Sequence, residues 1–296
     1  MRLALVGLAL LVAATSCASP AAETAGLDAE SRELAAYLAT TYRLTGELLA
    51  EQAAAMPSFQ DIAEGSPQAT AEQQAAVLVL LEDYLAALSA IDPPAGAADF
   101  HTRTAAMIEQ SIAGNRALQE ASGSGDPEQV LQASRDMLAL VGELLQESFE
   151  LAFEAANIVE QVLAGREDPE SRYIIELLAL RTSPASQLME TIGSQLSAVS
   201  TVDEMADLLD TTTSAMVALE ADYSAITPPQ AWSALHEEQL QLLTDAIDLY
   251  SRMADALEDP TEIVELFEEL LDFATRVPEL SAKLSSNLAD YFESLA

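Results

Sequence analysis

A repeated turn constrains the fold of this chain more than any other feature of its sequence. Residues 91–101 and 226–236 share an isoleucine, two consecutive prolines, an apolar residue and a histidine at the same spacing. These segments contain the only double prolines and the only two histidines in the chain. Downstream, Asp126-Pro127 is matched by Asp259-Pro260. We interpret the pattern as two copies of one structural unit.

Helix-forming residues dominate both copies. Ala, Leu, Glu and Gln are abundant, glycine is absent after Gly193, and aromatic residues make up only 5% of the chain, so the sequence predicts an all-α protein. Proline interrupts a helix interior, whereas Asp126 is suited to cap a helix that begins at Pro127. Pro184 and Pro278 lie inside predicted helices and are expected to kink or split them. The expected helices are 29–55, 70–91 (with Thr70 as N-cap), 97–120, 127–165, 169–199, 203–225, 231–258 and 260–295.

Four amphipathic helices in each copy are enough to form a bundle. We therefore predict two tandem up-down four-helix bundles, produced by an internal duplication, over residues 28–165 and 166–296. A single merged body of eight helices is the alternative, and the sequence pattern does not decide between them.

The N-terminus has the layout of an export signal. Arg2 is followed by a short apolar run, and small residues precede Cys17, the only cysteine in the chain. The segment Ala13-Ala14-Thr15-Ser16-Cys17 resembles the lipobox of bacterial lipoproteins, although Ala14 replaces the favoured leucine. This resemblance implies a signal peptide over residues 1–16, acylation of Cys17 and attachment to the outer face of the cell membrane or to the outer membrane. Ordinary cleavage, with Cys17 as a bystander, is the alternative. Residues 17–27, poor in large apolar side chains, are expected to form a flexible tether.

The chain is strongly acidic. Its 49 acidic and 12 basic residues give a formal net charge of −37, which argues against a nucleic-acid partner because binding to phosphates requires Lys and Arg. Solubility and adaptation to a salty habitat both account for such a charge. Cation binding is the functional alternative.

The two histidines are candidates for a ligand site. His101 and His236 lie near the start of the third helix of each copy, on its inward edge. We expect each imidazole to hydrogen-bond a backbone carbonyl freed by the prolines, and the alternative is contact with a ligand or a metal ion. Trp232 takes the place of Ala97 in the second copy and is expected to pack at the end of a bundle; the alternative is that it lines a ligand pocket.

A row of glutamates on the fourth helix is the other candidate site. Glu143, Glu147, Glu150 and Glu154 follow one another at helical spacing, so they share one face. A solvated face is the simpler interpretation, because a calcium or iron site would need oxygen ligands from another helix as well.

The sequence contains no recognisable catalytic motif, phosphate-binding loop or cofactor motif. Its two-unit plan resembles that of imelysin-like and related helical periplasmic proteins, but no histidine–glutamate motif carries over their metal site. We therefore predict a non-enzymatic, lipid-anchored envelope protein without a cofactor, which binds an envelope protein or a small ligand. A cation-handling or small-ligand-binding lipoprotein is the alternative.

Overall fold

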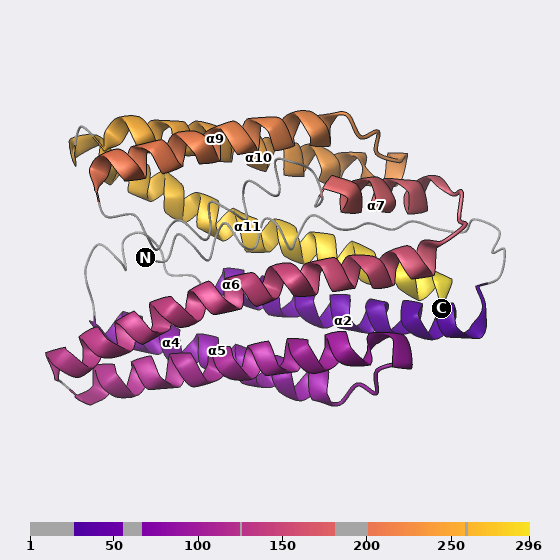
Figure 1. Cartoon of the computed structure of the whole chain (residues 1–296), viewed down its shortest axis with the longest axis horizontal. Coiled ribbons are helices and arrows are strands. Elements are labelled where there is room, and N and C mark those ends of the chain that lie inside the picture. The colour runs from indigo at the N-terminus through magenta and orange to yellow at the C-terminus, as the bar shows by residue number, and fades with distance from the viewer. Residues whose placement is uncertain (1–26, 56–66, 125, 181–200, 258–259) are drawn as a thin grey trace.

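The computed structural model describes residues 27–55, 67–124, 126–180, 201–257 and 260–296. Within these ranges the chain forms helices and no strand, which confirms the all-α prediction. The long helices lie roughly along one common direction (Figure 1). The predicted signal peptide, Cys17 and most of the predicted tether lie outside the described residues. Among the helices that are described, none is both long and apolar enough to span a membrane.

The predicted first copy, residues 28–165, contains four long helices: α2 (Ala29–Ala54), α4 (Pro67–Ser89), α5 (Ala98–Ser124) and α6 (Pro127–Leu163). Asp126 caps α6 by accepting a hydrogen bond from the Glu128 backbone N–H at 2.9 Å, as predicted. The second helix begins at Pro67 and not at Thr70, because proline is tolerated in the first turn, where no intrahelical N–H is needed.

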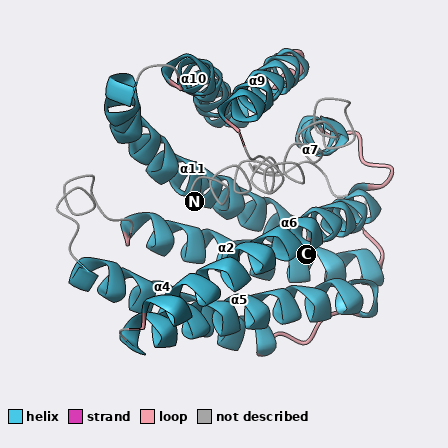
Figure 2. Ribbon diagram, turned by 60° about the vertical axis from the view of Figure 1, so that its left-hand side comes forward, coloured by secondary structure: helices cyan, strands magenta, loops and turns pink. Residues whose placement is uncertain are grey.

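The second copy contains α7 (Pro169–Leu180), α9 (Val202–Ser224), α10 (Ser233–Ala256) and α11 (Pro260–Leu295). Thr201 caps α9 in a reciprocal capping box with Glu204. The predicted continuation of α7 to residue 199, with Pro184, lies outside the described residues. Pro278 does not split α11, because it removes only one donor from a helix that packs against α2 and α10. Figure 2 shows α11 as a single curved helix.

The two double-proline turns have the same backbone conformation. Pro94 has φ −64° and ψ 157°, and Pro229 has φ −62° and ψ 159°. Each second proline accepts a hydrogen bond from the residue three positions later, Ala97 at 2.8 Å and Trp232 at 2.9 Å. A single 3-10 turn (η1, Ala95–Ala97; η3, Gln230–Trp232) then leads into the third helix of each copy.

The first and last long helices pack against each other. Among the described helices, α2 and α11 share the most extensive contact. Gly46 allows their close approach, since a Cβ atom at this position would lie 3.2 Å from the Ala282 carbonyl oxygen. Arg43 of α2 also pairs with Glu293 of α11 at 2.6 Å. A helix of the first copy is therefore joined mainly to a helix of the second.

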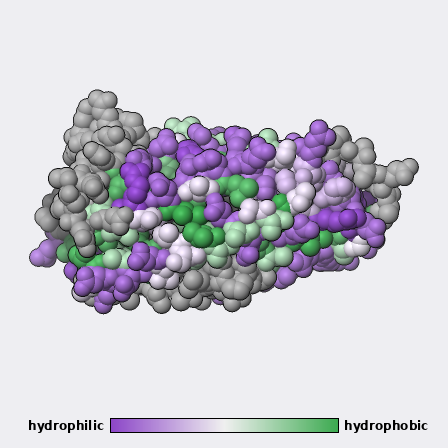
Figure 3. Space-filling model, turned by 90° about the horizontal axis from the view of Figure 1, so that it is seen from above, coloured by the Kyte–Doolittle hydropathy of each residue, from purple (hydrophilic) through white to green (hydrophobic). Residues whose placement is uncertain are grey.

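The hydrophobic core is continuous across both copies. One cluster of buried side chains runs from Leu34 in α2 to Leu295 in α11 and includes α6, α7, α9 and α10. A small separate cluster lies between α4 and α5, around Ile108. The shared core favours a single merged helical body over two independent bundles. On the face shown in Figure 3, hydrophilic residues surround apolar residues that gather toward its middle.

Candidate functional site

His101 links α5 to α2 inside the first copy. Its side chain is buried, and its Nδ1 lies 3.3 Å from the hydroxyl oxygen of Tyr37. Burial raises the pKa of Tyr37, so its hydroxyl stays protonated and can donate this hydrogen bond. The Nδ1 partner is thus a tyrosine hydroxyl, whereas the sequence analysis expected a carbonyl freed by the prolines.

His236 makes the corresponding link from α10 to α7. Its Nδ1 lies 2.9 Å from the Tyr173 hydroxyl, and its ring stacks on Tyr223 of α9 with centroids 4.4 Å apart. Burial lowers the pKa of His236, and the neighbouring Glu237 opposes this shift only in part. The neutral imidazole is therefore the form that suits the folded protein.

Trp232 is fully buried, as predicted, and its ring meets Tyr173 edge to face at 4.8 Å. Its indole Nε1 is the one buried side-chain nitrogen or oxygen among the described residues that has no hydrogen-bond partner. The sequence pattern indicates both histidines and this tryptophan as candidates but does not indicate the tyrosines. The signal that could indicate them is their spacing, since Tyr37 precedes His101 by 64 residues and Tyr173 precedes His236 by 63.

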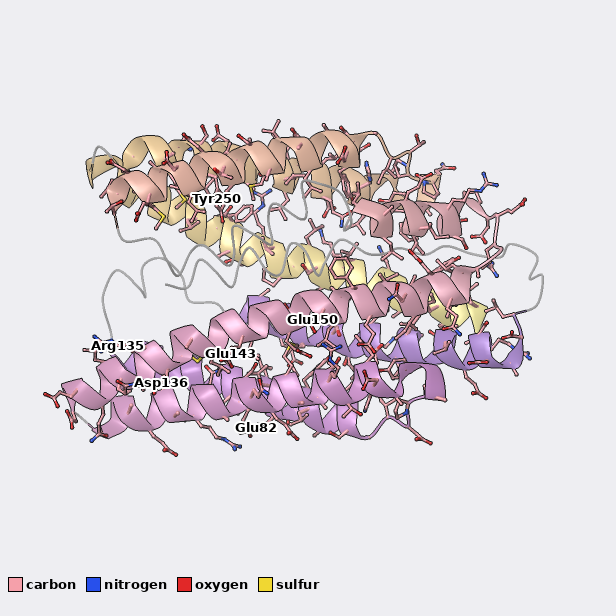
Figure 4. All side chains as sticks on the ribbon, in the orientation of Figure 1. Glu82, Arg135, Asp136, Glu143, Glu150 and Tyr250 are labelled. Carbon is pink, nitrogen blue, oxygen red and sulfur yellow. The ribbon has the colours of Figure 1, made fainter. Side chains whose placement is uncertain are left out.

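The glutamate row of α6 is held by Arg103, which projects from α5. The guanidinium contacts Glu147 at 2.8 Å, Glu150 at 2.7 Å and Glu154 at 3.1 Å. The hydrogen bond from Arg103 to Glu147, with support from Glu150 and Glu154, raises the pKa of Arg103 further. The fourth member of the row, Glu143, is exposed and is not among these partners; Figure 4 labels it on α6 together with Glu150. The expected solvated face is therefore in large part an ion-paired contact between helices.

The second copy joins its third and fourth helices by other ion pairs. Lys283 of α11 contacts Glu238 of α10 at 2.6 Å, and Arg276 contacts Asp245 at 2.6 Å. Arg252 of α10 also contacts Glu269 of α11 at 2.5 Å. In two of these pairs the basic residue lies on α11 and the acidic residue on α10. In the third pair the basic residue, Arg252, lies on α10.

A buried polar network ties the connection between the copies to the last helix. Asp168 accepts hydrogen bonds from Arg166 Nε at 2.9 Å and from the Ser171 hydroxyl at 2.8 Å. The hydroxyls of Ser171 and Tyr291 are 2.5 Å apart. Burial raises the pKa of Tyr291 to about 12. For Asp168, burial acts to raise the pKa, but the hydrogen bonds from Ser171 and the charge of Arg166 lower it overall.

No sequence pattern indicates this network, because its members come from the connecting segment and the distant end of α11. The Ser171 hydroxyl is fully buried and committed to Asp168 and Tyr291, so it is not placed to attack a substrate. Arg166 and Asp168 are held within the same network, with side chains only 10% and 9% exposed. The network joins the segment between α6 and α7 to the end of α11.

The structure therefore brings each candidate histidine to a tyrosine and most of the glutamate row to one arginine, but it does not bring the histidines to the glutamates. Across the described residues, no group of three or more His, Cys, Asp or Glu side chains is arranged to hold a metal ion. Comparison of the chain with family models, with curated proteins and with solved structures found no match.

Proposed function

We propose that this protein is a lipid-anchored, extracytoplasmic helical module that acts by binding or scaffolding and not by catalysis. The observation that supports the proposal is that the side chains best suited to catalysis are engaged in contacts between helices. His101 and His236 are buried against tyrosines, and Arg103 is occupied by three carboxylates. Groups engaged in this way stabilise helix contacts and are poorly placed to meet a substrate.

We further infer that the body arose by duplication of a four-helix unit whose two copies share one core. Three features support this inference: the repeated proline turns, the repeated tyrosine–histidine contacts and the aspartates that begin corresponding helices. Asp28 and Asp168 each accept a hydrogen bond from the backbone N–H of a serine three residues later, at 2.8 Å and 2.9 Å.

The anchor rests on the lipobox-like segment that ends at Cys17. Covalent acyl chains contribute about 0.8 kcal/mol per buried methylene, and more than one chain gives stable membrane attachment. The test is expression of the full chain in bacteria that are fed an alkyne-labelled fatty acid. We expect label on the wild type and none on Cys17→Ser, with Ser19→Ala as a matched control that keeps the label. An unlabelled wild-type protein would contradict the anchor.

The alternative, cation binding, has one supporting observation: Arg103 offers a single positive charge to three glutamates. Native mass spectrometry of the Cys17→Ser chain with calcium, iron or zinc separates the two functions. A stoichiometric adduct that disappears in Glu147→Gln with Glu150→Gln would establish cation binding at this cluster. An adduct lost in His101→Ala with His236→Ala would move it to the histidines. The same apo mass under all conditions is the result that the binding or scaffold proposal expects.

A further inference from the structure

The ion pairs between third and fourth helices have opposite polarity at corresponding positions of the two copies. Arg103 and Glu238 lie at the same spacing after the second proline of their turn. Glu150 and Lys283 lie at the same spacing after the proline that begins their helix, Pro127 in α6 and Pro260 in α11. At these positions the first copy has its cation on the third helix and the second copy has it on the fourth, with contact distances of 2.7 Å and 2.6 Å. Arg252 of α10, at a different position, pairs with Glu269 of α11 in the opposite sense.

A further position on the fourth helix shows the same inversion. Glu143 of α6 and Arg276 of α11 also lie at equal spacing after the initial proline of their helices. Arg276 pairs with Asp245 of α10. Lys283, which makes the other pair, is the only lysine in the chain. At two positions where α6 has a glutamate of its acidic row, α11 therefore has a basic residue.

Helix exchange is a competing arrangement for a chain built from two copies of one unit. The α2–α11 contact already joins the first copy to the second, and the core is continuous across both. Helices of related sequence can exchange places between copies, or between two chains, as in domain swapping. Correct pairing of α5 with α6 and of α10 with α11 therefore needs a feature that distinguishes the two fourth helices.

The charges supply that distinction. If α11 took the place of α6, Lys283 would face Arg103, and if α6 took the place of α11, Glu150 would face Glu238. Each exchange replaces an attraction with a repulsion between like charges. A single surface ion pair contributes little stability. Specificity, however, depends on the free-energy difference between correct and incorrect helix pairing, and both the attraction in the correct pair and the repulsion in the incorrect pair contribute to that difference.

We propose that the inverted charges select the correct fourth helix for each third helix and so prevent helix exchange between the copies and between chains. The proposal rests on the inferred duplication, because only a duplicated unit gives α6 and α11 interchangeable positions. It assigns Lys283, Arg276, Glu238 and Asp245 to pairing specificity in addition to stability.

The decisive variant gives the second copy the polarity of the first. It combines Glu238→Arg, Asp245→Arg, Arg276→Glu and Lys283→Glu in the full chain, with Cys17→Ser in all proteins so that no acyl chain is added. Both ion pairs are retained in reverse, and the net charge is unchanged. Each protein is unfolded in urea and refolded at several concentrations, and its oligomeric state is measured by size exclusion with light scattering.

We expect the reversed variant to melt within about 2 °C of the reference protein, which carries Cys17→Ser alone. Its ratio of dimer to monomer after refolding should rise on the order of tenfold, the effect of losing about 1.4 kcal/mol of discrimination. The matched control is Glu82→Arg with Arg116→Glu, which reverses a pair between α4 and α5 and should refold as the reference does.

Two results would overturn the proposal. An unchanged Tm with reference-like refolding would show that the charges do not select helices, and would leave the duplication intact. A fall in Tm of more than about 5 °C would show that the substitutions destabilise the fold itself, for example through Arg276→Glu next to Asp272 in the same helix, and a neutral variant then decides. This variant (Glu238→Gln, Asp245→Asn, Arg276→Gln, Lys283→Gln) gives a second measure if the reversed protein folds poorly. Its dimer ratio should also exceed that of the reference, and an equal ratio would contradict selection by charge.

Discussion

At the scale of single residues, the histidines show how burial fixes a protonation state. His236 shares one hydrogen bond with Tyr173 and stacks on Tyr223, with only 4% of its surface exposed. A charged imidazole would lose hydration without gaining an adjacent anion strong enough to compensate, because Glu237 offsets the lowered pKa only in part. Neutral His236 is therefore part of the folded state.

This burial predicts a loss of stability in acid. Because the pKa of His236 is lower in the folded protein than its ordinary value of 6.5, the unfolded chain binds more protons as the pH falls below that value. The contribution of neutral His236 to the free energy of unfolding is fully present above pH 6.5 and is lost as the pH falls toward the pKa of His236 in the folded protein. Urea unfolding of the wild type and of His236→Gln from pH 8 to pH 5 should give free-energy curves that converge in acid. Parallel curves would contradict the prediction.

Tyr291 permits a second test at this scale. Its hydroxyl contacts Ser171 and Asp168 inside the network at the connection between the copies. Removing it in Tyr291→Phe leaves buried partners with one hydrogen bond fewer, so the free energy of unfolding should fall by about 1–3 kcal/mol. Thermal and urea unfolding measure the loss. Tyr84→Phe is the comparison for a tyrosine outside this network. The Tyr84 hydroxyl lies 3.2 Å from the Thr45 hydroxyl in a partly buried contact, so its removal should cost less.

At the scale of elements, glycine has opposite roles in α2 and α6. A Cβ atom at Gly46 would press on the Ala282 carbonyl oxygen of α11, whereas one at Gly142 would meet nothing within 4 Å. Both glycines lie within helices, where alanine is favoured by about 1 kcal/mol. Local propensity and helix packing therefore compete at the first position and do not compete at the second.

The same substitution should consequently have opposite effects at the two sites. Gly142→Ala should raise the free energy of unfolding by about 0.5–1 kcal/mol through helix propensity. Gly46→Ala should lower it by about 1 kcal/mol, because overpacking against a helix backbone outweighs that gain. Urea unfolding of the two variants checks both signs, and a stabilised Gly46→Ala protein would show that α2 and α11 can move apart at little cost.

Features carried by neighbouring residues could be predicted from the sequence. The double prolines, the cap at Asp126 and the start of α11 at Pro260 depend on local backbone chemistry, and the structure has them as expected. The partners of the candidate residues could not be predicted in this way. Arg103 reaches glutamates 44 to 51 residues away, and the reach depends on how α5 and α6 are rotated against each other. The α2–α11 contact joins residues even farther apart in the sequence. No sequence pattern predicts which amphipathic faces will pack against each other.

At the scale of the whole molecule, the net charge of −37 opposes compaction. The ion pairs between helices counteract only part of this repulsion, since the chain has 12 basic residues for 49 acidic ones. Most of the pairs are partly exposed and contribute little individually. Long-range repulsion among unpaired carboxylates should therefore outweigh local attraction.

Added salt should stabilise the protein for this reason. A tenfold rise in NaCl, from about 0.05 M to about 0.5 M, shortens the screening length roughly threefold and so weakens repulsion across the whole surface. We expect Tm, measured by circular dichroism, to rise by several degrees, on the order of 5 °C. KCl should give the same rise if screening is the cause. A fall in Tm with either salt would mean that the ion pairs dominate the electrostatic balance.

The pairing of α2 with α11 also affects the order in which the chain can fold. During synthesis α2 emerges well before α11, so the part of α2 that packs against α11 stays uncovered until α11 has been made, although α4 and α6 also contact α2. Contacts between such distant segments carry a large loop-closure cost and form slowly. A partly made chain would expose the α2 surface that α11 later covers, and such exposed surface promotes aggregation. The part of the core that α2 and α11 share therefore forms only after α11 has emerged.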